Sequence, residues 1–185
     1  ASYDDLPDRI RKNMQTIGCD LSKYEEESAL IFIDCCSSLA GARSQEKHSV
    51  QQPFALTELS IATSIALDET NTSPKALFLD STTSLFGNLN ASLVIGFLQD
   101  RCAKIKAKNG IFVFTLGKET VQPKFANRLE EAVDCIIELG AFEERGISSK
   151  KLRVRKLAGQ KHLKEWITFS IEPNRGIVFR VKKAK

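Results

Sequence analysis

The amino-acid sequence predicts an α/β domain in which helices flank a mostly parallel β-sheet and antiparallel hairpins follow at the C-terminal end. Residues 29–34, 75–80 and 111–115 are short apolar runs without polar alternation, which is typical of parallel strands buried on both faces. Segments with helical spacing of apolar residues lie between these runs. After residue 132, strand-like segments follow one another with no helical pattern between them. Strands that alternate with helices and then continue as a meander predict this fold class.

The chain opens with residues 1–3, which look like the end of a strand, and continues into a predicted helix. Pro7 stands where the first turn of a helix tolerates proline. Apolar residues recur at helical spacing from Ile10 to Ile17. Gly18 suits the position just after a helix, so the helix is expected to end before it.

The middle of the chain alternates predicted strands with predicted helices. Asn90 is a suitable N-cap for the second of these helices, because its side chain can accept a hydrogen bond from the first helical turn. A polar loop and a charged loop containing Pro123 interrupt the alternation. In order, the expected elements are strand 29–34, loop 35–53, helix 54–69, strand 75–80, helix 91–108, strand 111–115 and loop 117–128.

The C-terminal part is predicted to consist of strands alone. The segments are short and are separated by turns, which favours antiparallel hairpins added to the edge of the parallel sheet. Residues 151–157 and 176–181 alternate clearly between apolar and polar residues. The four expected strands are 135–139, 151–157, 166–171 and 176–181.

The composition is that of one globular domain. The chain has 185 residues, of which 42% are hydrophobic and 27% charged, enough to bury a sizeable core. No apolar run is long enough to cross a membrane, and no basic-then-apolar leader opens the sequence. The five cysteines lack C-x-x-C spacing, so we expect neither a disulfide framework nor a zinc site. A reducing, cytoplasmic location fits this cysteine usage.

Charge is distributed unevenly along the chain. Residues 145–185 carry 13 Lys or Arg against Glu165 and Glu172, whereas residues 1–144 carry 14 basic and 21 acidic residues. A basic section beside an acidic body could bind nucleic acid. It could equally pair with the acidic part of another copy of the chain, or form a solvated surface. Charge alone leaves these three interpretations open.

Residues 77–83 carry the strongest local signal for a functional site. The apolar run ends at Asp80, and Ser81, Thr82 and Thr83 follow directly. Open α/β sheets bind ligands at the carboxyl ends of their strands, where nucleotide hydrolases place an acid that positions magnesium. An ordinary acid at the end of a strand would give the same pattern.

Five motifs occur in an order that resembles one family. Asp4 and Asp5 precede the first predicted helix, and residues 13–21 resemble the end of that helix and the turn after it. Residues 77–83 are similar to a Walker B strand, and residues 133–139 to the strand that opens a C-terminal hairpin. Residues 152–162 resemble a K-L-R-G-x-x-H segment. Together they cover nearly the whole chain and resemble the KaiC-like branch of the RecA-superfamily ATPases.

This resemblance implies a RecA-like fold, a homo-oligomeric ring such as a hexamer, and ATP with Mg²⁺ as ligands. Asp80 would hold the magnesium ion through water, and Asp4 and Asp5 would polarise the attacking water. Other residues would contact nucleotide: Thr16 beside the adenine, Ser81 next to Asp80, Thr115 at the γ-phosphate, and Lys156, Gln160 and His162 toward the nucleotide of the neighbouring subunit.

Each of these residues also has a structural interpretation. Asp80 could be a strand-end acid that caps a loop, and Asp4 and Asp5 could be a solvated helix start that complements the helix dipole. Thr16 could be an ordinary residue of a helix surface. A lone histidine near a strand end, such as His162, is more often structural than functional.

Departures from the family pattern reduce the expected activity. No G-x-x-x-x-G-K-(S/T) segment occurs, so residues 1–185 are expected to form a single RecA/KaiC-like domain that lacks its N-terminal P-loop. Ala158 stands where family members often carry an Arg that speeds phosphoryl transfer in the next subunit. Asp4 and Asp5 replace a usual Glu pair, so their shorter side chains reach less far toward the attacking water. Weak or absent hydrolysis is expected.

Three functions remain open from the sequence. The favoured one is an ATP-binding, ring-forming signalling or scaffold protein with a protein partner and at most weak ATPase activity. The second is a RecA- or RadA-like accessory protein that binds DNA in recombination or repair through residues 145–185. This is less favoured because we find no DNA-binding helix motif. The third is a pseudo-ATPase that serves as an interaction module, with loops 35–53 and 117–128 available to partners.

Overall fold

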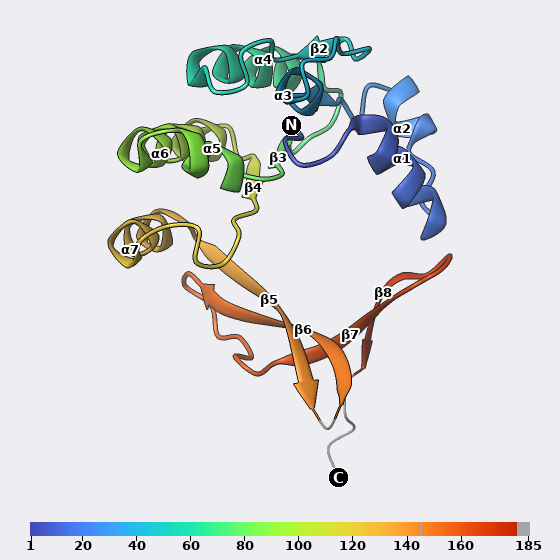
Figure 1. The fold of residues 1–185 in the computed structure, drawn as a ribbon, viewed down its shortest axis with the longest axis vertical. Coiled ribbons are helices and arrows are strands. Elements are labelled where there is room, and N and C mark those ends of the chain that lie inside the picture. The colour runs from blue at the N-terminus through green and yellow to red at the C-terminus, as the bar shows by residue number, and fades with distance from the viewer. Residues whose placement is uncertain (145, 181–185) are drawn as a thin grey trace.

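A short parallel sheet lies at the centre of the N-terminal part of the molecule. The computed structural model describes residues 1–144 and 146–180 (Figure 1). Strand β1 (Ile33–Asp34) pairs with β2 (His48–Ser49), and β3 (Ala76–Leu79) pairs with β4 (Ile111–Phe114), each in parallel. Residues 1–3 lie between β1 and β3, because Ser2 forms parallel bridges with both Asp34 and Asp80. The expected strand end at residues 1–3 is therefore confirmed.

Helices pack against one face of β3 and β4, and the other face of these two strands is exposed. Helices α1 (Pro7–Thr16), α4 (Leu56–Glu69) and α6 (Ala91–Ala107) lie where the sequence predicts them. The Asn90 side chain caps α6 by accepting a hydrogen bond from the Ser92 amide at 2.9 Å. Figure 1 shows α4, α5, α6 and α7 along one side of the strands and α1 and α2 on the other. Within the described residues, no helix is long and apolar enough to cross a membrane.

The buried core lies between the parallel strands and helices α4 and α6. Short helices α2 (Ser22–Glu26), α3 (Cys36–Leu39) and α5 (Thr83–Asn88) fill the connections around it. Burial of these apolar side chains is the main favourable contribution to folding. The core cluster comprises Tyr3, Ile33, Cys35, Val50, Leu59, Ala66, Leu79, Leu85, Val94, Ile95, Leu98 and Leu129.

The predicted C-terminal hairpins form a separate sheet. Strands β5 (Cys135–Glu144), β6 (Ile147–Leu157), β7 (Ile167–Glu172) and β8 (Gly176–Arg180) pair in sequential antiparallel order. The hairpins are confirmed, but the expected attachment to the parallel sheet is wrong for residues 1–144 and 146–180, where no pairing joins β4 to β5. Helix α7 (Pro123–Ala132) lies between these two strands in the chain and separates them.

Three local expectations need correction. Only the last two residues of the predicted strand 29–34 are in a strand, because the Leu30 amide instead bonds the Tyr24 carbonyl at 2.9 Å and closes α2. The predicted loop 117–128 contains the first part of α7, with Pro123 as its first residue. The predicted loop 35–53 contains α3 and β2. Residue 181, the last of the expected final strand, lies outside the described residues.

Burial of the parallel strands also differs from the expectation. Leu77 and Leu79 are 6% and 2% exposed, whereas Phe78 between them is 60% exposed. Its register partner Val113 is 40% exposed. The sequence predicts that both faces of these strands are buried, but β3 and β4 bury only one. An unbroken apolar run looks the same in both cases, because it does not show which face other elements cover.

The β7–β8 turn lies against Gly18, just after the end of α1. Gly18 follows α1 with φ of +83°, and a Cβ added there would stand 2.7 Å from the Asn174 Cα atom. No larger residue fits at this distance without moving the turn. This contact and α7 connect the C-terminal sheet to the rest of the chain.

Candidate functional site

The carboxyl ends of the parallel strands bring three predicted site residues, Asp4, Asp80 and Thr115, to one edge of the sheet. The Tyr3 amide donates to the Asp80 carbonyl at 2.6 Å, so the chain that leads into Asp4 runs beside β3. Thr115 follows β4, the other neighbour of β3. Parallel strands end at a common edge, and this is the edge where α/β sheets bind ligands.

Asp80 and Thr115 meet directly at this edge. The Thr115 hydroxyl donates to the Asp80 Oδ1 atom at 2.5 Å, and both residues are exposed. A hydrogen bond to a carboxylate is shorter and stronger than a neutral one and limits its rotation. Asp80 is therefore held at the strand end while its carboxylate stays accessible to a ligand.

The loop after Asp80 is fixed by its own hydroxyl groups. Ser81 is buried and its Oγ accepts a hydrogen bond from the Thr83 amide at 3.2 Å. Thr82 is fully buried, and its amide and hydroxyl donate to the Thr115 carbonyl at 2.9 and 2.8 Å. The Thr83 hydroxyl accepts from the Gly117 amide at 2.8 Å. These bonds tie the loop to the end of β4.

The two residues of the acidic pair have different surroundings. Asp4 is exposed, and its Oδ1 accepts from the Ser84 hydroxyl at 3.3 Å. Asp5 serves the start of α1, because its Oδ1 accepts from the Leu6 amide at 3.0 Å and its Oδ2 lies 3.4 Å from the Arg9 Nε. Asp4 is thus the member of the pair that faces α5, beside the loop that follows Asp80.

Thr16 lies away from this edge. It is the last residue of α1, and its hydroxyl donates to the Asn13 carbonyl at 2.7 Å within the same helix. A helix of this length extends about 15 Å along its axis, so Thr16 stands roughly that far from the residues at the start of α1. The structure does not bring it into the group formed by Asp4, Asp80 and Thr115.

Lys156, Gln160 and His162 belong to the C-terminal sheet and the loop after β6. The Lys156 ammonium donates to the Glu130 carbonyl of α7 at 2.5 Å. Gln160 is exposed, and its carbonyl lies 3.2 Å from the His162 Nδ1. The His162 Nε2 is buried and has no hydrogen-bond partner among residues 1–144 and 146–180. Lys156 thus contacts α7, Gln160 and His162 contact each other, and none of these hydrogen bonds involves Asp80.

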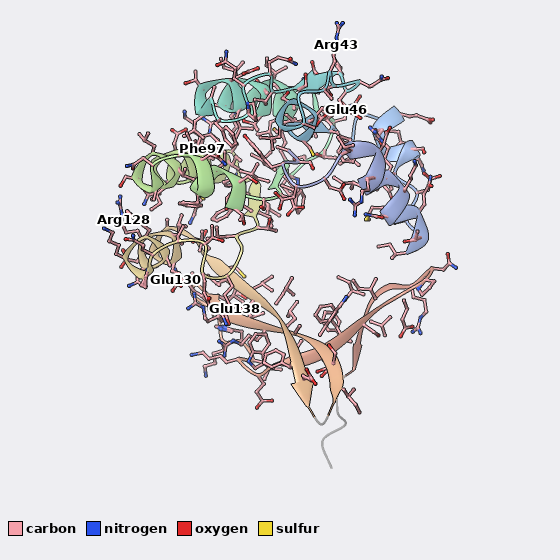
Figure 2. All side chains as sticks on the ribbon, viewed as in Figure 1. Arg43, Glu46, Phe97, Arg128, Glu130 and Glu138 are labelled. Atoms are coloured by element: carbon pink, nitrogen blue, oxygen red, sulfur yellow. The ribbon has the colours of Figure 1, made fainter. Side chains whose placement is uncertain are left out.

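The basic strand β6 is partly neutralised by acids of its own chain. Arg153 pairs with Glu138 at 2.6 Å, and Arg155 pairs with Glu138 at 3.0 Å and with Glu130. Figure 2 shows Glu130 on α7 and Glu138 on β5 close together, where Arg155 joins them. The adjoining Trp166 is half-buried, packs edge-on against Phe142 at 4.8 Å and lies under Arg153 at 4.6 Å.

Asp34 and Ser84 are two residues at this edge that sequence reasoning missed. Asp34 ends β1 and is 2% exposed. Burial alone would raise the pKa of Asp34, but hydrogen bonds from Ser37, Ser44 and the Cys36 amide favour its charged form and place the net pKa below the usual value. Its position after an apolar run was a usable signal. No local signal connects Ser84 to Asp4, because they are far apart in sequence.

The side chains around Asp80 fit a hydrated magnesium ion. Carboxylate and hydroxyl oxygens are the ligands that Mg²⁺ prefers, and Mg²⁺ commonly keeps several waters and uses only one or two carboxylates. Asp80 and Asp4 supply carboxylates, and Thr115 supplies a hydroxyl. Within the described residues, no cluster of three or more His, Cys, Asp or Glu side chains could enclose a metal by itself. The arrangement therefore suits an ion that arrives with water and phosphate.

Comparisons with known proteins agree with this architecture. The family model for KaiC ATPases matches residues 1–184. A UPF0273 protein of Pyrococcus furiosus is 28% identical over 188 residues, covering 100% of this chain and 74% of that protein. A UPF0273 protein of Methanopyrus kandleri is 27% identical over 165 residues, and the match covers 88% of this chain and 64% of that relative.

A solved structure supports the fold independently. The crystal structure of a KaiC-like protein of Pyrococcus horikoshii matches with a TM-score of 0.74 and 20% identity, covering 96% of this chain and 74% of that one. At this identity the likeness concerns the fold. A RecA-like α/β fold is therefore shown for the chain, and nucleotide binding is the activity that the family match suggests.

Proposed function

Because the chain belongs to the KaiC family of ATPases, we propose that it is the ATP-binding domain of a ring-forming signalling or scaffold protein with weak or absent hydrolysis. The observation that carries this proposal is the edge where Asp4, Asp80 and Thr115 lie together. Its acidic and hydroxyl groups stand at the carboxyl ends of neighbouring parallel strands. That is where nucleotide-binding α/β sheets place their ligands.

Each residue at the edge has a role in the proposal. A bound magnesium ion would neutralise charge on the phosphates, and Asp80 would hold its water shell. Thr115, which restrains Asp80, would stand at the γ-phosphate. Ser81 supports the loop beneath them. Asp4 would orient the attacking water, whereas Asp5 starts α1.

Weak hydrolysis is proposed from two features of the chain. Ala158 offers no cation to a neighbouring active site, and an Arg in trans can speed phosphoryl transfer by a large factor. The Lys156 ammonium is bound to the Glu130 carbonyl and would have to leave it to reach a phosphate.

The uneven distribution of charge supports the ring. Residues 1–144 carry an excess of acidic residues and residues 145–185 an excess of basic residues, so the basic part of one copy would pair with the acidic part of the next.

The phosphate-binding loop is the part of the site that these residues do not supply. No G-x-x-x-x-G-K-(S/T) segment occurs in the 185 residues. That such a segment precedes Ala1 stays a prediction, as does a cytoplasmic location. Tests of nucleotide binding therefore use the full-length protein.

Thermal unfolding of the full-length protein with ATP and Mg²⁺ tests the proposal. Ligand at 100 times its Kd should stabilise the folded state by about 2.7 kcal/mol. Asp80→Asn should remove the Mg²⁺-dependent part of the shift, because it removes the charge that holds the ion's water shell. Asp68→Asn, an exposed acid beside Lys108 at the end of α4, should leave the shift unchanged. No stabilisation by ATP would refute the proposal and favour a pseudo-ATPase interaction module.

DNA binding receives less support than nucleotide binding. Exposed Lys150, Lys161 and Lys164 favour it, but Arg153 and Arg155 are paired with acids of the same chain. Binding to DNA with an affinity that falls steeply as salt increases would support the recombination-accessory alternative.

A further inference from the structure

Ser84 connects α5 to the acidic pair. It is the second residue of α5, and its hydroxyl donates to the Asp4 Oδ1 at 3.3 Å. Within residues 1–144 and 146–180, it is the one side-chain hydrogen-bond donor to Asp4. The distance is long for an O–H···O bond. Catalytic hydrogen bonds are often long without substrate and shorten when it binds.

Both partners of this contact stand on well-fixed main chain. Thr82, two residues before Ser84, is fully buried and bonds the Thr115 carbonyl through its amide and its hydroxyl. Tyr3, one residue before Asp4, bonds the Asp80 carbonyl and is 2% exposed. The separation of Ser84 and Asp4 is therefore set by β3 and β4 rather than by a mobile loop.

The surroundings of Asp4 give this hydroxyl a specific task. Asp5 is restrained by Leu6 and Arg9, but the exposed Asp4 carboxylate would rotate in solvent without a donor. The exposed carboxylates of Asp80 and Asp4 each accept a hydrogen bond from one hydroxyl group at this edge. Thr115 donates to Asp80, and Ser84 donates to Asp4. A small loss of orientation at a reacting group can cost a large factor in rate.

We propose that Ser84 is a positioning residue that holds the Asp4 carboxylate toward the water that attacks the γ-phosphate. This inference rests on the proposed function and adds a residue that acts through Asp4. Ser84 does not touch nucleotide in this proposal. Its removal should therefore slow turnover without weakening the binding of ATP.

ATP turnover of the full-length protein with Mg²⁺ tests the inference. Ser84→Ala should lower kcat about tenfold and change the KM for ATP less than about twofold, because orientation is lost and binding contacts remain. Ser84→Thr keeps the hydroxyl and should restore most of the rate. Ser92→Ala, an exposed serine in the first turn of α6, is the matched control and should turn over as the wild type does. Alanine favours helices more than serine does, so Ser84→Ala should fold.

A double-mutant cycle shows whether Ser84 acts through Asp4. In an Asp4→Asn background, adding Ser84→Ala should reduce kcat by less than about twofold, since the carboxylate it positions is gone. An undiminished tenfold loss in that background would overturn the inference. So would an unchanged kcat in Ser84→Ala, or a Ser84→Thr variant as slow as Ser84→Ala.

Binding and turnover separate this inference from the proposed function. If ATP with Mg²⁺ stabilises the protein but is not hydrolysed, the inference about Ser84 fails and the binding function stands. If ATP gives no stabilisation, the proposed function itself fails and the inference fails with it.

Discussion

Asp34 is a buried carboxylate held in its charged form by its neighbours. It accepts hydrogen bonds from the Cys36 and Ser37 amides at 2.9 and 3.0 Å and from the Ser37 and Ser44 hydroxyls at 2.6 Å. Asp34→Asn replaces one acceptor oxygen by a donor at a site surrounded by donors. We expect a loss of about 2 kcal/mol in the free energy of unfolding, measured by urea denaturation at pH 7.

The same residue should contribute to acid unfolding. The pKa of Asp34 lies below its usual value in the folded chain, so its contribution is complete above the unfolded pKa of about 4. That contribution is lost as the pH falls through the lower folded value. The wild-type curve of stability against pH should therefore fall more steeply below pH 4 than that of Asp34→Asn. Parallel curves for the two proteins would contradict this account, and exposed Asp68→Asn should follow the wild type.

At the scale of elements, one guanidinium joins α1, α2 and the segment before β2. Arg11 bonds Glu25 at 2.6 Å, Glu46 at 2.7 Å and Asp8 at 2.8 Å, and it stands over the Phe32 ring at 4.6 Å. The hydrogen bonds that Arg11 donates to the Glu25 and Glu46 carboxylates raise the pKa of Arg11, so it stays charged. Figure 2 shows Glu46 in the segment between α3 and β2 that this contact anchors.

Arg11→Lys should loosen this junction. A lysine keeps the charge but cannot bond Glu25 and Glu46 in two planar forks, so we expect a loss of about 2 kcal/mol in unfolding free energy. Amide hydrogen exchange should accelerate in residues 41–46 more than in α6. Arg9→Lys is the control, because Arg9 is 73% exposed and has one 3.4 Å contact with Asp5. Arg9→Lys should lower the free energy of unfolding by less than about 0.5 kcal/mol. Equal losses in the two variants would show that Arg11 does not hold α1, α2 and the segment before β2 together.

Elements were predictable where local rules decide them. Asn90 caps α6 and Asp80 directly follows β3, as the sequence indicates, because capping and strand ends depend on nearby residues. The sequence does not predict helix α7, because a charged segment that contains Pro123 also fits a loop. Proline nevertheless suits the first helical position, and Leu129 is the buried residue of this helix. The contact of Ser84 with Asp4 could not be predicted, since it depends on how distant segments pack.

At the scale of the whole molecule, the β3–β4 sheet and the C-terminal sheet each have an apolar face that no other described part of the chain covers. On β3 and β4, Phe78, Ile111 and Val113 share one face and are 60%, 52% and 40% exposed. On the C-terminal sheet, Leu139 of β5 and the facing pair Ile171 and Ile177 of β7 and β8 are also exposed. Monomeric proteins rarely expose large contiguous apolar patches, and such patches mark interaction surfaces or a tendency to associate.

The 185-residue chain by itself should therefore bind the hydrophobic dye ANS and associate as its concentration rises. Replacing Phe78, Ile111 and Val113 together by Thr should at least halve the dye fluorescence, because these side chains form one exposed face. The variant should still fold, since threonine suits strands and Leu77 and Leu79 keep the buried face. Leu163→Thr is the control: Leu163 is 72% exposed but lies in the loop between β6 and β7, outside the sheet face. Equal dye binding by the triple variant and the wild type, with circular dichroism unchanged, would show that this face is not the surface that associates.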